Sequence, residues 1–185
     1  MNRQKIEEFL KKYGVTNYII HENLIVDVDG DVSICNINLM SLSFQFGEVT
    51  GSFNCYGNKL ESLKYCPHTV GGSFNCSINN LKSLKYCPAI VMKGFYCGRN
   101  DLASLKYCPH HLGGGFDCSN NKLTSLQHCP TARIGTYYCA GNSFKVTEAT
   151  ESGWLEAIKI NNKVYEYIPN PTSEMTSLHK FIWEV

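Results

Sequence analysis

The sequence predicts an α/β-type, mainly β solenoid, a right-handed stack of short coils whose strands run parallel. Three observations support this fold class. Five cysteines recur at intervals of 21 residues, an aromatic residue stands two places before each of them, and in four copies leucine recurs five and eight places after them. Side chains two apart lie on the same face of a strand. One coil cannot bury that face alone, but coils stacked about 4.8 Å apart bury it together as internal ladders.

Each copy of the repeat has the same key positions. The first cysteine ladder consists of Cys55, Cys76, Cys97, Cys118 and Cys139, preceded by Phe53, Phe74, Phe95, Phe116 and Tyr137. A second ladder, with a proline after each member, consists of Cys66, Cys87, Cys108 and Cys129. Asparagine stands three places after each first-ladder cysteine, as Asn58, Asn79, Asn100, Asn121 and Asn142. A buried amide there can satisfy backbone groups left open where the strand bends away. The proline suits an irregular return path.

The segment before the repeats predicts a cap and a first coil that keeps only some of the repeat positions. Val32 and Ile34 stand one period before Phe53 and Cys55, which extends the stack by one coil. Residues 3–13 predict an amphipathic helix. Residues 18–34 predict strands around an Asp-Gly turn at 29–30. We expect residues 1–29 to cap a solenoid of about six coils that spans residues 30–145.

The 21-residue period stops after Phe144. Residues 157–168 alternate apolar and polar side chains about an Asn-Asn turn and predict a β-hairpin. Residues 173–183 predict a short helix. We assign residues 146–185 to a C-terminal cap, because an uncapped solenoid end would expose a hydrophobic layer.

The pattern F-x-C-x-x-N-x-L-x-x-L-x-x-C-P resembles a leucine-rich repeat, with phenylalanine and cysteine in the strand leucine positions. It is similar to the cysteine-containing 21-residue repeats of many bacteriophage and some bacterial proteins. The similarity covers residues 49–144, and the opening segment resembles the one that leads into such repeats. The resemblance implies a solenoid and a phage-encoded protein that binds and blocks a host protein, such as a defence protein.

The composition bears on the class of protein. The chain has 185 residues, of which 43% are hydrophobic, and a formal net charge of +1. That balance gives no general attraction to nucleic acid or anionic membranes. The charged opening segment lacks the apolar run of a secretory signal, and no stretch is apolar enough to span a bilayer. We expect a cytoplasmic protein, in the host cell cytoplasm if phage-encoded, that binds neither nucleic acid nor membrane.

The ten cysteines leave disulfides, metal ligands and core packing as alternatives until their spacing is considered. A structural zinc site is usually seeded by a C-x2-4-C pair, which is absent here. Ladder cysteines in register point the same way, which suits stacking more than disulfide bonding. We therefore predict nine buried, reduced thiols, an outward-facing Cys35, and no metal or other cofactor. The acidic run at 27–31 has its glycine too early for an EF-hand, so a turn explains it better.

Two surfaces are candidates for binding. On the exposed strand face, positions beside the ladder cysteines vary while the core does not, which is typical of a binding surface on a fixed scaffold. These candidates are Asn54, Tyr56, Asn75, Ser77, Tyr96, Asp117, Ser119 and Tyr138. A second stripe on the return path consists of Lys64, Tyr65, Lys85, Tyr86, Lys106 and Tyr107. Stacked lysines repel one another, so they fan into solvent or meet an anionic partner.

The sequence contains no phosphate-cradling loop or hydrolase motif, and nine cysteines are interchangeable repeat positions, so no catalytic residue is assigned. The functional prediction is a non-enzymatic module that binds a protein partner through the strand face. The alternative is a structural or accessory virion protein that recognises a host surface or glycan. The sequence names neither the partner nor the oligomeric state.

Overall fold

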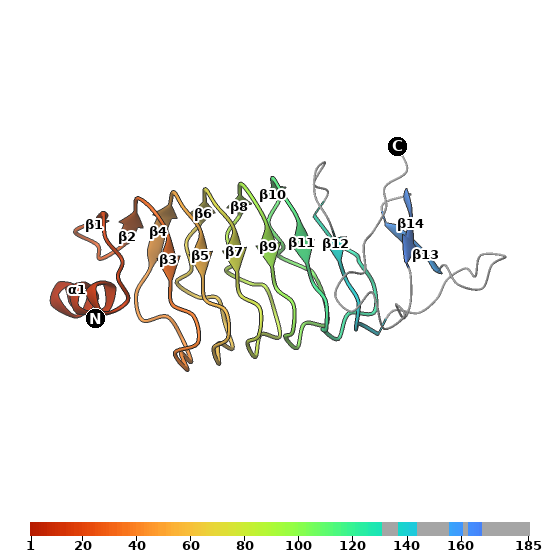
Figure 1. Ribbon diagram of the computed structural model, residues 1–185, viewed down its shortest axis with the longest axis horizontal. Coiled ribbons are helices and arrows are strands. Elements are labelled where there is room, and N and C mark those ends of the chain that lie inside the picture. The colour runs from red at the N-terminus through yellow and green to blue at the C-terminus, as the bar shows by residue number, and fades with distance from the viewer. Residues whose placement is uncertain (131–136, 144–155, 161–162, 168–185) are drawn as a thin grey trace.

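The protein is a mainly β parallel solenoid with one short N-terminal helix (Figure 1). The computed structural model describes residues 1–130, 137–143, 156–160 and 163–167. Each coil contributes short strands to two sheets, which lie on opposite sides of a common core (Figure 1). The predicted fold class is confirmed.

The first sheet, here called the aromatic sheet, contains one two-residue strand from each coil. Its strands are β3 (Val32–Ser33), β5 (Phe53–Asn54), β7 (Phe74–Asn75), β9 (Phe95–Tyr96), β11 (Phe116–Asp117) and β12 (Tyr137–Tyr138). Neighbouring strands pair in parallel one period apart, so Phe53 faces Phe74 and Phe74 faces Phe95. Residues of one coil donate backbone hydrogen bonds to the next, as from the Cys55 N–H to the Asn75 carbonyl at 2.8 Å.

The second sheet, here called the return sheet, differs from the sequence prediction, which gives the segment after each proline only an irregular return path. It consists of β1 (Tyr18–Ile20), β2 (Val26–Val28), β4 (Phe46–Val49), β6 (Thr69–Val70), β8 (Ile90–Val91) and β10 (His111–Leu112). The proline that follows each second-ladder cysteine lies just before this strand, as Pro67 lies before β6. Proline lacks a backbone donor, so it ends the turn without removing a ladder hydrogen bond.

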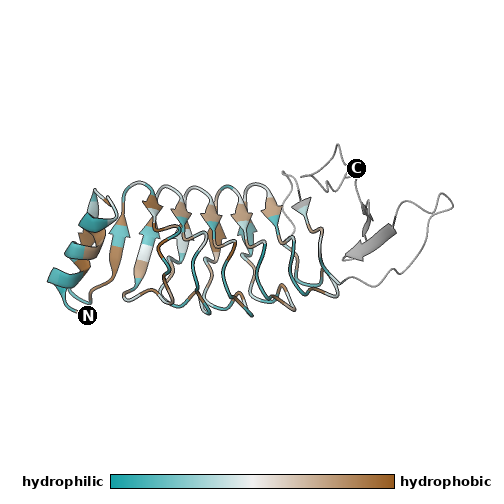
Figure 2. Cartoon of the chain, turned by 60° about the horizontal axis from the view of Figure 1, so that its bottom comes forward, coloured by the Kyte–Doolittle hydropathy of each residue, from teal (hydrophilic) through white to brown (hydrophobic). Residues whose placement is uncertain are grey.

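The core consists of stacked ladders between the two sheets. The rings of Phe53, Phe74, Phe95 and Phe116 are stacked, with centroids 5.5–5.9 Å apart. The leucines of each coil and the first-ladder cysteines are also buried. Colouring by hydropathy shows hydrophobic and hydrophilic residues close together in the strands and also along the connecting segments (Figure 2). Aromatic rings offset along a column gain stabilisation beyond their buried area.

The asparagine ladder performs the role that the sequence predicts for it. The Asn79 side-chain amide donates to the carbonyls of Cys55 and Cys76 at 3.0 and 3.1 Å. Its oxygen accepts the Leu60 N–H at 2.9 Å, so one side chain links two coils. Asn58, Asn100, Asn121 and Asn142 repeat the arrangement. Polar backbone groups at the bend are therefore satisfied inside the core.

The N-terminal helix α1 (Arg3–Lys12) begins at Asn2, whose side chain accepts the Lys5 N–H at 3.0 Å. Ile6 and Leu10 are fully buried in the same core as the first coils. The Phe9 ring packs edge-on against Phe44, with centroids 5.3 Å apart. The apolar side of α1 thus closes this end of the core, and its polar side faces away from the solenoid (Figure 2).

Strands lie on both sides of the predicted Asp-Gly turn at 29–30, but these two strands do not pair with each other. The antiparallel pair is β1 with β2, and its turn lies at residues 21–25, where Leu24 has a φ of 63°. Strand β2 then pairs in parallel with β4, and residues 29–30 form the corner that carries the chain to β3 in the aromatic sheet. An Asp-Gly pair favours a tight turn but does not determine which strands it joins.

The predicted C-terminal hairpin is confirmed. Strands β13 (Glu156–Ile160) and β14 (Lys163–Tyr167) pair antiparallel, with Ile160 facing Lys163. The helix predicted at 173–183 lies outside the described residues.

Each coil turns through a left-handed backbone position two places after its ladder residue. Gly57 and Asn120 suit this position, but Ile78 occupies it with a φ of 53°. A β-branched side chain is strained there, since its Cβ approaches the following carbonyl.

We expect Ile78→Asn to raise the free energy of unfolding by about 1 kcal/mol, because asparagine tolerates this conformation. Urea unfolding followed by circular dichroism measures the change. Ile90→Asn is the control, since Ile90 is also half-buried but lies in the extended strand β8. We expect that control to lower stability, and an equal loss in both variants would contradict the prediction.

Candidate functional site

The strand-face candidates lie on the outer side of the aromatic sheet. Asn54, Asn75, Tyr96, Asp117 and Tyr138 are paired in register and form one row across five strands. Tyr56 and Ser119 lie in the neighbouring row, while Ser77 of that row is buried. The structure therefore brings the predicted residues together on one face, although Ser77 contributes little surface to it.

Three residues of this face have a structural role that sequence reasoning missed. The Asn54 side-chain oxygen accepts the backbone N–H of Tyr56 at 3.0 Å. In the same way, a side-chain oxygen of Asn75 accepts the Ser77 N–H at 3.0 Å. A side-chain oxygen of Asp117 accepts the Ser119 N–H at 2.8 Å. Asparagine and aspartate commonly close such local turns. Each of these side chains stabilises the end of its own strand, and its freedom to rearrange around a partner is reduced.

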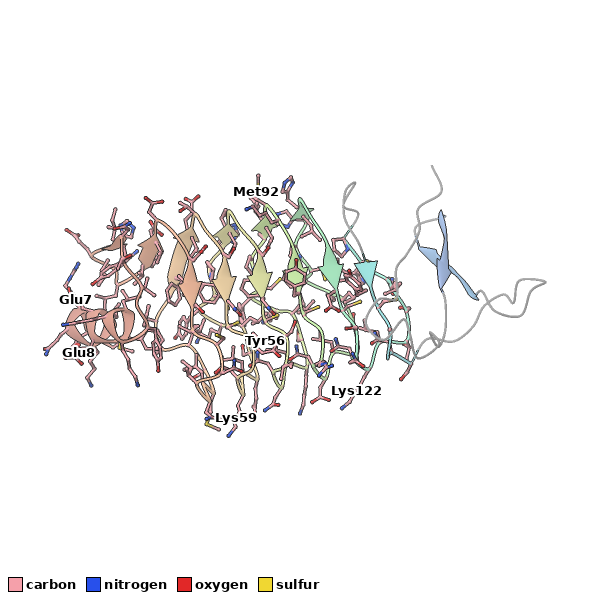
Figure 3. All side chains as sticks on the ribbon, viewed as in Figure 1. Glu7, Glu8, Tyr56, Lys59, Met92 and Lys122 are labelled. Carbon is pink, nitrogen blue, oxygen red and sulfur yellow. The ribbon has the colours of Figure 1, made fainter. Side chains whose placement is uncertain are left out.

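The tyrosines of this face differ from its asparagines. Tyr56 lies just beyond the end of strand β5 and is half-buried (labelled in Figure 3). The Tyr96 ring lies so close to Gly94 that a Cβ on that glycine would overlap it. Among the described residues, neither Tyr56 nor Tyr96 makes a side-chain hydrogen bond. The Tyr96 ring is held by packing against Gly94, and both tyrosines keep their hydroxyl groups for other partners.

The second candidate stripe, here called the Lys–Tyr stripe, is built from three copies of one turn. The Cys66 N–H donates to the Leu63 carbonyl at 3.0 Å, which closes a turn over Lys64 and Tyr65. The Ser62 hydroxyl oxygen accepts the Lys64 N–H at 3.1 Å. Ser83 and Ser104 repeat this bond in the next two coils, a role that the regular serine of each repeat could have revealed.

The tyrosines of the Lys–Tyr stripe occupy a strained backbone position. Tyr65, Tyr86 and Tyr107 have φ angles of 75°, 72° and 75°. The third residue of such a turn is normally glycine or asparagine, because a Cβ is disfavoured there. Tyr86 and Tyr107 are nevertheless 51% and 50% exposed, so core packing does not explain why tyrosine stands there.

The lysines of the stripe do not simply fan into solvent. The Nζ atoms of Lys64, Lys85 and Lys106 lie 4.8, 4.9 and 5.2 Å from the ring centroids of the tyrosines that follow them. A cation at this distance from an aromatic face is attracted by the ring. A shallow hollow of about 280 Å³ lies beside the first two turns and is lined by Tyr65, His68 and Tyr86 together with Lys64.

The near-neutral net charge conceals a basic central region. Between residues 59 and 129 the chain has eight lysines and arginines and only three acidic residues. One of the acids, Asp101, is already paired with Lys122, which lowers the pKa of its carboxyl group. The turn surfaces of the solenoid therefore carry unbalanced positive charge, which whole-chain composition could not reveal.

All ten cysteines are free thiols. Seven are buried, but Cys87 and Cys108 of the second ladder are partly exposed, as is Cys35, so the prediction of nine hidden thiols is too high. Cys87 and Cys108 directly follow the turns of the half-exposed Tyr86 and Tyr107, whereas Cys66 follows the less exposed Tyr65 and is buried. Burial raises the pKa of Cys87 and Cys129 to about 12, which keeps both as unreactive thiols at neutral pH.

The acidic run at residues 27–31 links the first two coils of the return sheet. Asp27 accepts the Glu48 N–H at 2.8 Å, and this bond, with a smaller contribution from His21, lowers the pKa of its carboxyl group. Asp29 accepts from the Thr50 hydroxyl and Asp31 from the Ser52 N–H. Within the described residues, no three metal-ligating side chains are grouped to hold an ion. In that same part of the chain no helix is long and apolar enough to cross a membrane.

Fold and surface together define a parallel β solenoid with two candidate binding surfaces and an inert thiol core. Comparisons with protein-family models, with curated proteins and with solved structures found no match to this chain. The resemblance to phage-type leucine-rich repeats therefore stays a prediction based on the repeat pattern.

Proposed function

We propose that this protein is a non-enzymatic module that binds a protein partner through the outer face of the aromatic sheet. The observation that carries the proposal is the contrast between the two sides of one strand. Inward positions repeat phenylalanine and cysteine in every coil from β5 to β11. The outward positions that face one another in register are Asn54, Asn75, Tyr96 and Asp117, so they are the same in the first two coils and differ after that. Side chains that differ on an identical frame give a surface its own shape.

The tyrosines Tyr56, Tyr96 and Tyr138 are the proposed anchors on this face. Tyrosine offers a large, rigid and amphipathic contact at low entropic cost, and aromatic side chains dominate the energetics of protein interfaces. Asn54, Asn75 and Asp117 keep the strand ends in shape and add polar contacts around the anchors. Such a module acts by covering a surface of its partner, as the resemblance to phage proteins implies for a host target.

We expect the double variant Tyr96→Ala/Tyr138→Ala to keep its fold and to weaken partner binding by about 1–4 kcal/mol. The partner is first captured from host lysate and identified by mass spectrometry, and its affinity for each variant is then measured by calorimetry. The control variant Tyr13→Ala alters a tyrosine of the N-terminal segment, far from β9 in the sequence. Unchanged affinity in the double variant would exclude the strand face as the binding site.

A further inference from the structure

We infer that the Lys–Tyr stripe is a second binding surface, which recognises an extended acidic peptide segment. This inference goes beyond the proposed function, because the stripe lies on the turns that follow the leucines and not on the outer face of the aromatic sheet. Its positive charge, its backbone geometry and its preorganisation each support the assignment.

The first argument is charge. Lys64, Lys85 and Lys106 are all exposed and stand one coil apart, so they span about 10 Å along the solenoid. None of them makes an ion pair with a described residue. Carboxylates on alternate residues of an extended peptide are about 7 Å apart, so two of them fit along the three ammonium groups. The attraction between these carboxylates and the lysine ammonium groups favours an acidic partner.

The second argument is the cost of placing tyrosine at this turn. A side chain in the left-handed region is tolerated where the surrounding structure or function requires it. Tyr86 and Tyr107 are half-exposed, so they gain little from burial, yet glycine or asparagine would fit the turn with less strain. Their hydroxyl groups can donate to a carboxylate, while the serine bonds beneath them hold the turns in place.

The third argument separates an acidic peptide from single-stranded nucleic acid. Bases bind such surfaces by stacking on open aromatic faces. In each turn of the stripe a lysine ammonium lies over the tyrosine ring, 4.8–5.2 Å from its centroid, so a base would have to displace it. Three cations in line also suit a short acidic segment better than the many phosphate contacts of a nucleic acid strand.

The test uses fluorescence anisotropy with a labelled eight-residue peptide of alternating glutamate and serine. We expect the full-length protein to bind this peptide, to bind it at least fivefold more weakly when salt is raised from about 50 to about 300 mM, and not to bind the glutamine-serine analogue. The triple variant Lys64→Gln/Lys85→Gln/Lys106→Gln should weaken binding at least tenfold. Lys59→Gln/Lys82→Gln/Lys93→Gln removes the same charge from exposed positions off the stripe and should have a small effect (Lys59 is labelled in Figure 3).

A second variant distinguishes binding from a merely structural role. Tyr86→Gly/Tyr107→Gly relieves the backbone strain, so we expect it to unfold at equal or higher urea concentration while it loses peptide binding. The Tyr96→Ala/Tyr138→Ala variant should bind the peptide normally, which separates this inference from the strand-face proposal. Equal losses in the two lysine triple variants, no binding at low salt, or tighter binding of a twelve-residue oligothymidine at the stripe would each overturn the inference.

Discussion

The protein is expected to unfold cooperatively as the pH rises above about 9, with most of its structure lost near pH 10. Burial raises the pKa of eight of the ten thiols, namely Cys66, Cys76, Cys87, Cys97, Cys108, Cys118, Cys129 and Cys139. In the unfolded chain these thiols ionise near their ordinary pKa of 9.0, while the folded Cys87 and Cys129 hold their protons to about 12. The folded state therefore binds more protons than the unfolded state above pH 9.

The sign and size of this effect follow from proton linkage. The stabilisation is fully present below pH 9 and is lost as the pH rises toward 12, because the unfolded state is increasingly favoured by ionisation. Each thiol contributes about 1.4 kcal/mol per pH unit in this window. Eight such thiols together reach the whole stability of a typical domain, about 5–15 kcal/mol, within one pH unit.

Urea unfolding at several pH values, with a reductant present, measures the slope of stability against pH. The variant Cys87→Ala/Cys129→Ala controls for lysine and tyrosine titration, since it removes only two thiols. Its slope between about pH 9.5 and 10.5 should be shallower by about 2–3 kcal/mol per pH unit. A stability that stays level over this range, or an identical slope in the variant, would show that the buried thiols are not responsible.

Asn79→Ala is expected to lower the free energy of unfolding by about 3–5 kcal/mol, although it replaces a polar residue by an apolar one. The side chain of Asn79 is 8% exposed and satisfies the Leu60 N–H and the carbonyls of Cys55 and Cys76. Alanine leaves these buried backbone groups without partners, and each unmet group costs about 1–3 kcal/mol. The loss extends over two coils, because the amide joins them.

The neighbouring residue provides a matched control. Asn80 is exposed, and its backbone N–H bonds to the Leu60 carbonyl whatever its side chain. We expect Asn80→Ala to change stability by less than about 0.5 kcal/mol. Urea unfolding of both variants, with the slope checked for two-state behaviour, makes the comparison. Similar losses from the two substitutions would mean that the asparagine ladder is not the source of stability.

Much of the fold could be predicted because identical side chains recur at a fixed interval. The period alone places Phe53 over Phe74 and Cys55 over Cys76, and it assigns Asn79 to the buried bend. The return sheet could not be predicted in the same way. Its strands are two residues long in most coils, as in Thr69–Val70, and so short a segment carries no alternating pattern.

The candidate site was predicted less completely. The sequence placed Asn54 and Asn75 on the outer face with the tyrosines, where they lie, but it did not reveal that both close turns in their own strands. It also placed the lysines and tyrosines of the Lys–Tyr stripe on one line. The left-handed conformation of Tyr86 could not be predicted, because a tyrosine in a turn sequence does not indicate whether its backbone is strained or relaxed.

The sequence by itself determined the solenoid, its period and the residues of its ladders. Stacking in register requires only that each coil repeat the apolar positions of the preceding coil. The 21-residue spacing of these positions shows that repetition directly. Tertiary structure alone decided which hydrogen bonds occupy the outer polar side chains, which thiols remain partly exposed, and how the lysines lie over their tyrosines. These features depend on backbone angles and on contacts with the next coil, and neither is fixed by the repeat of residue types.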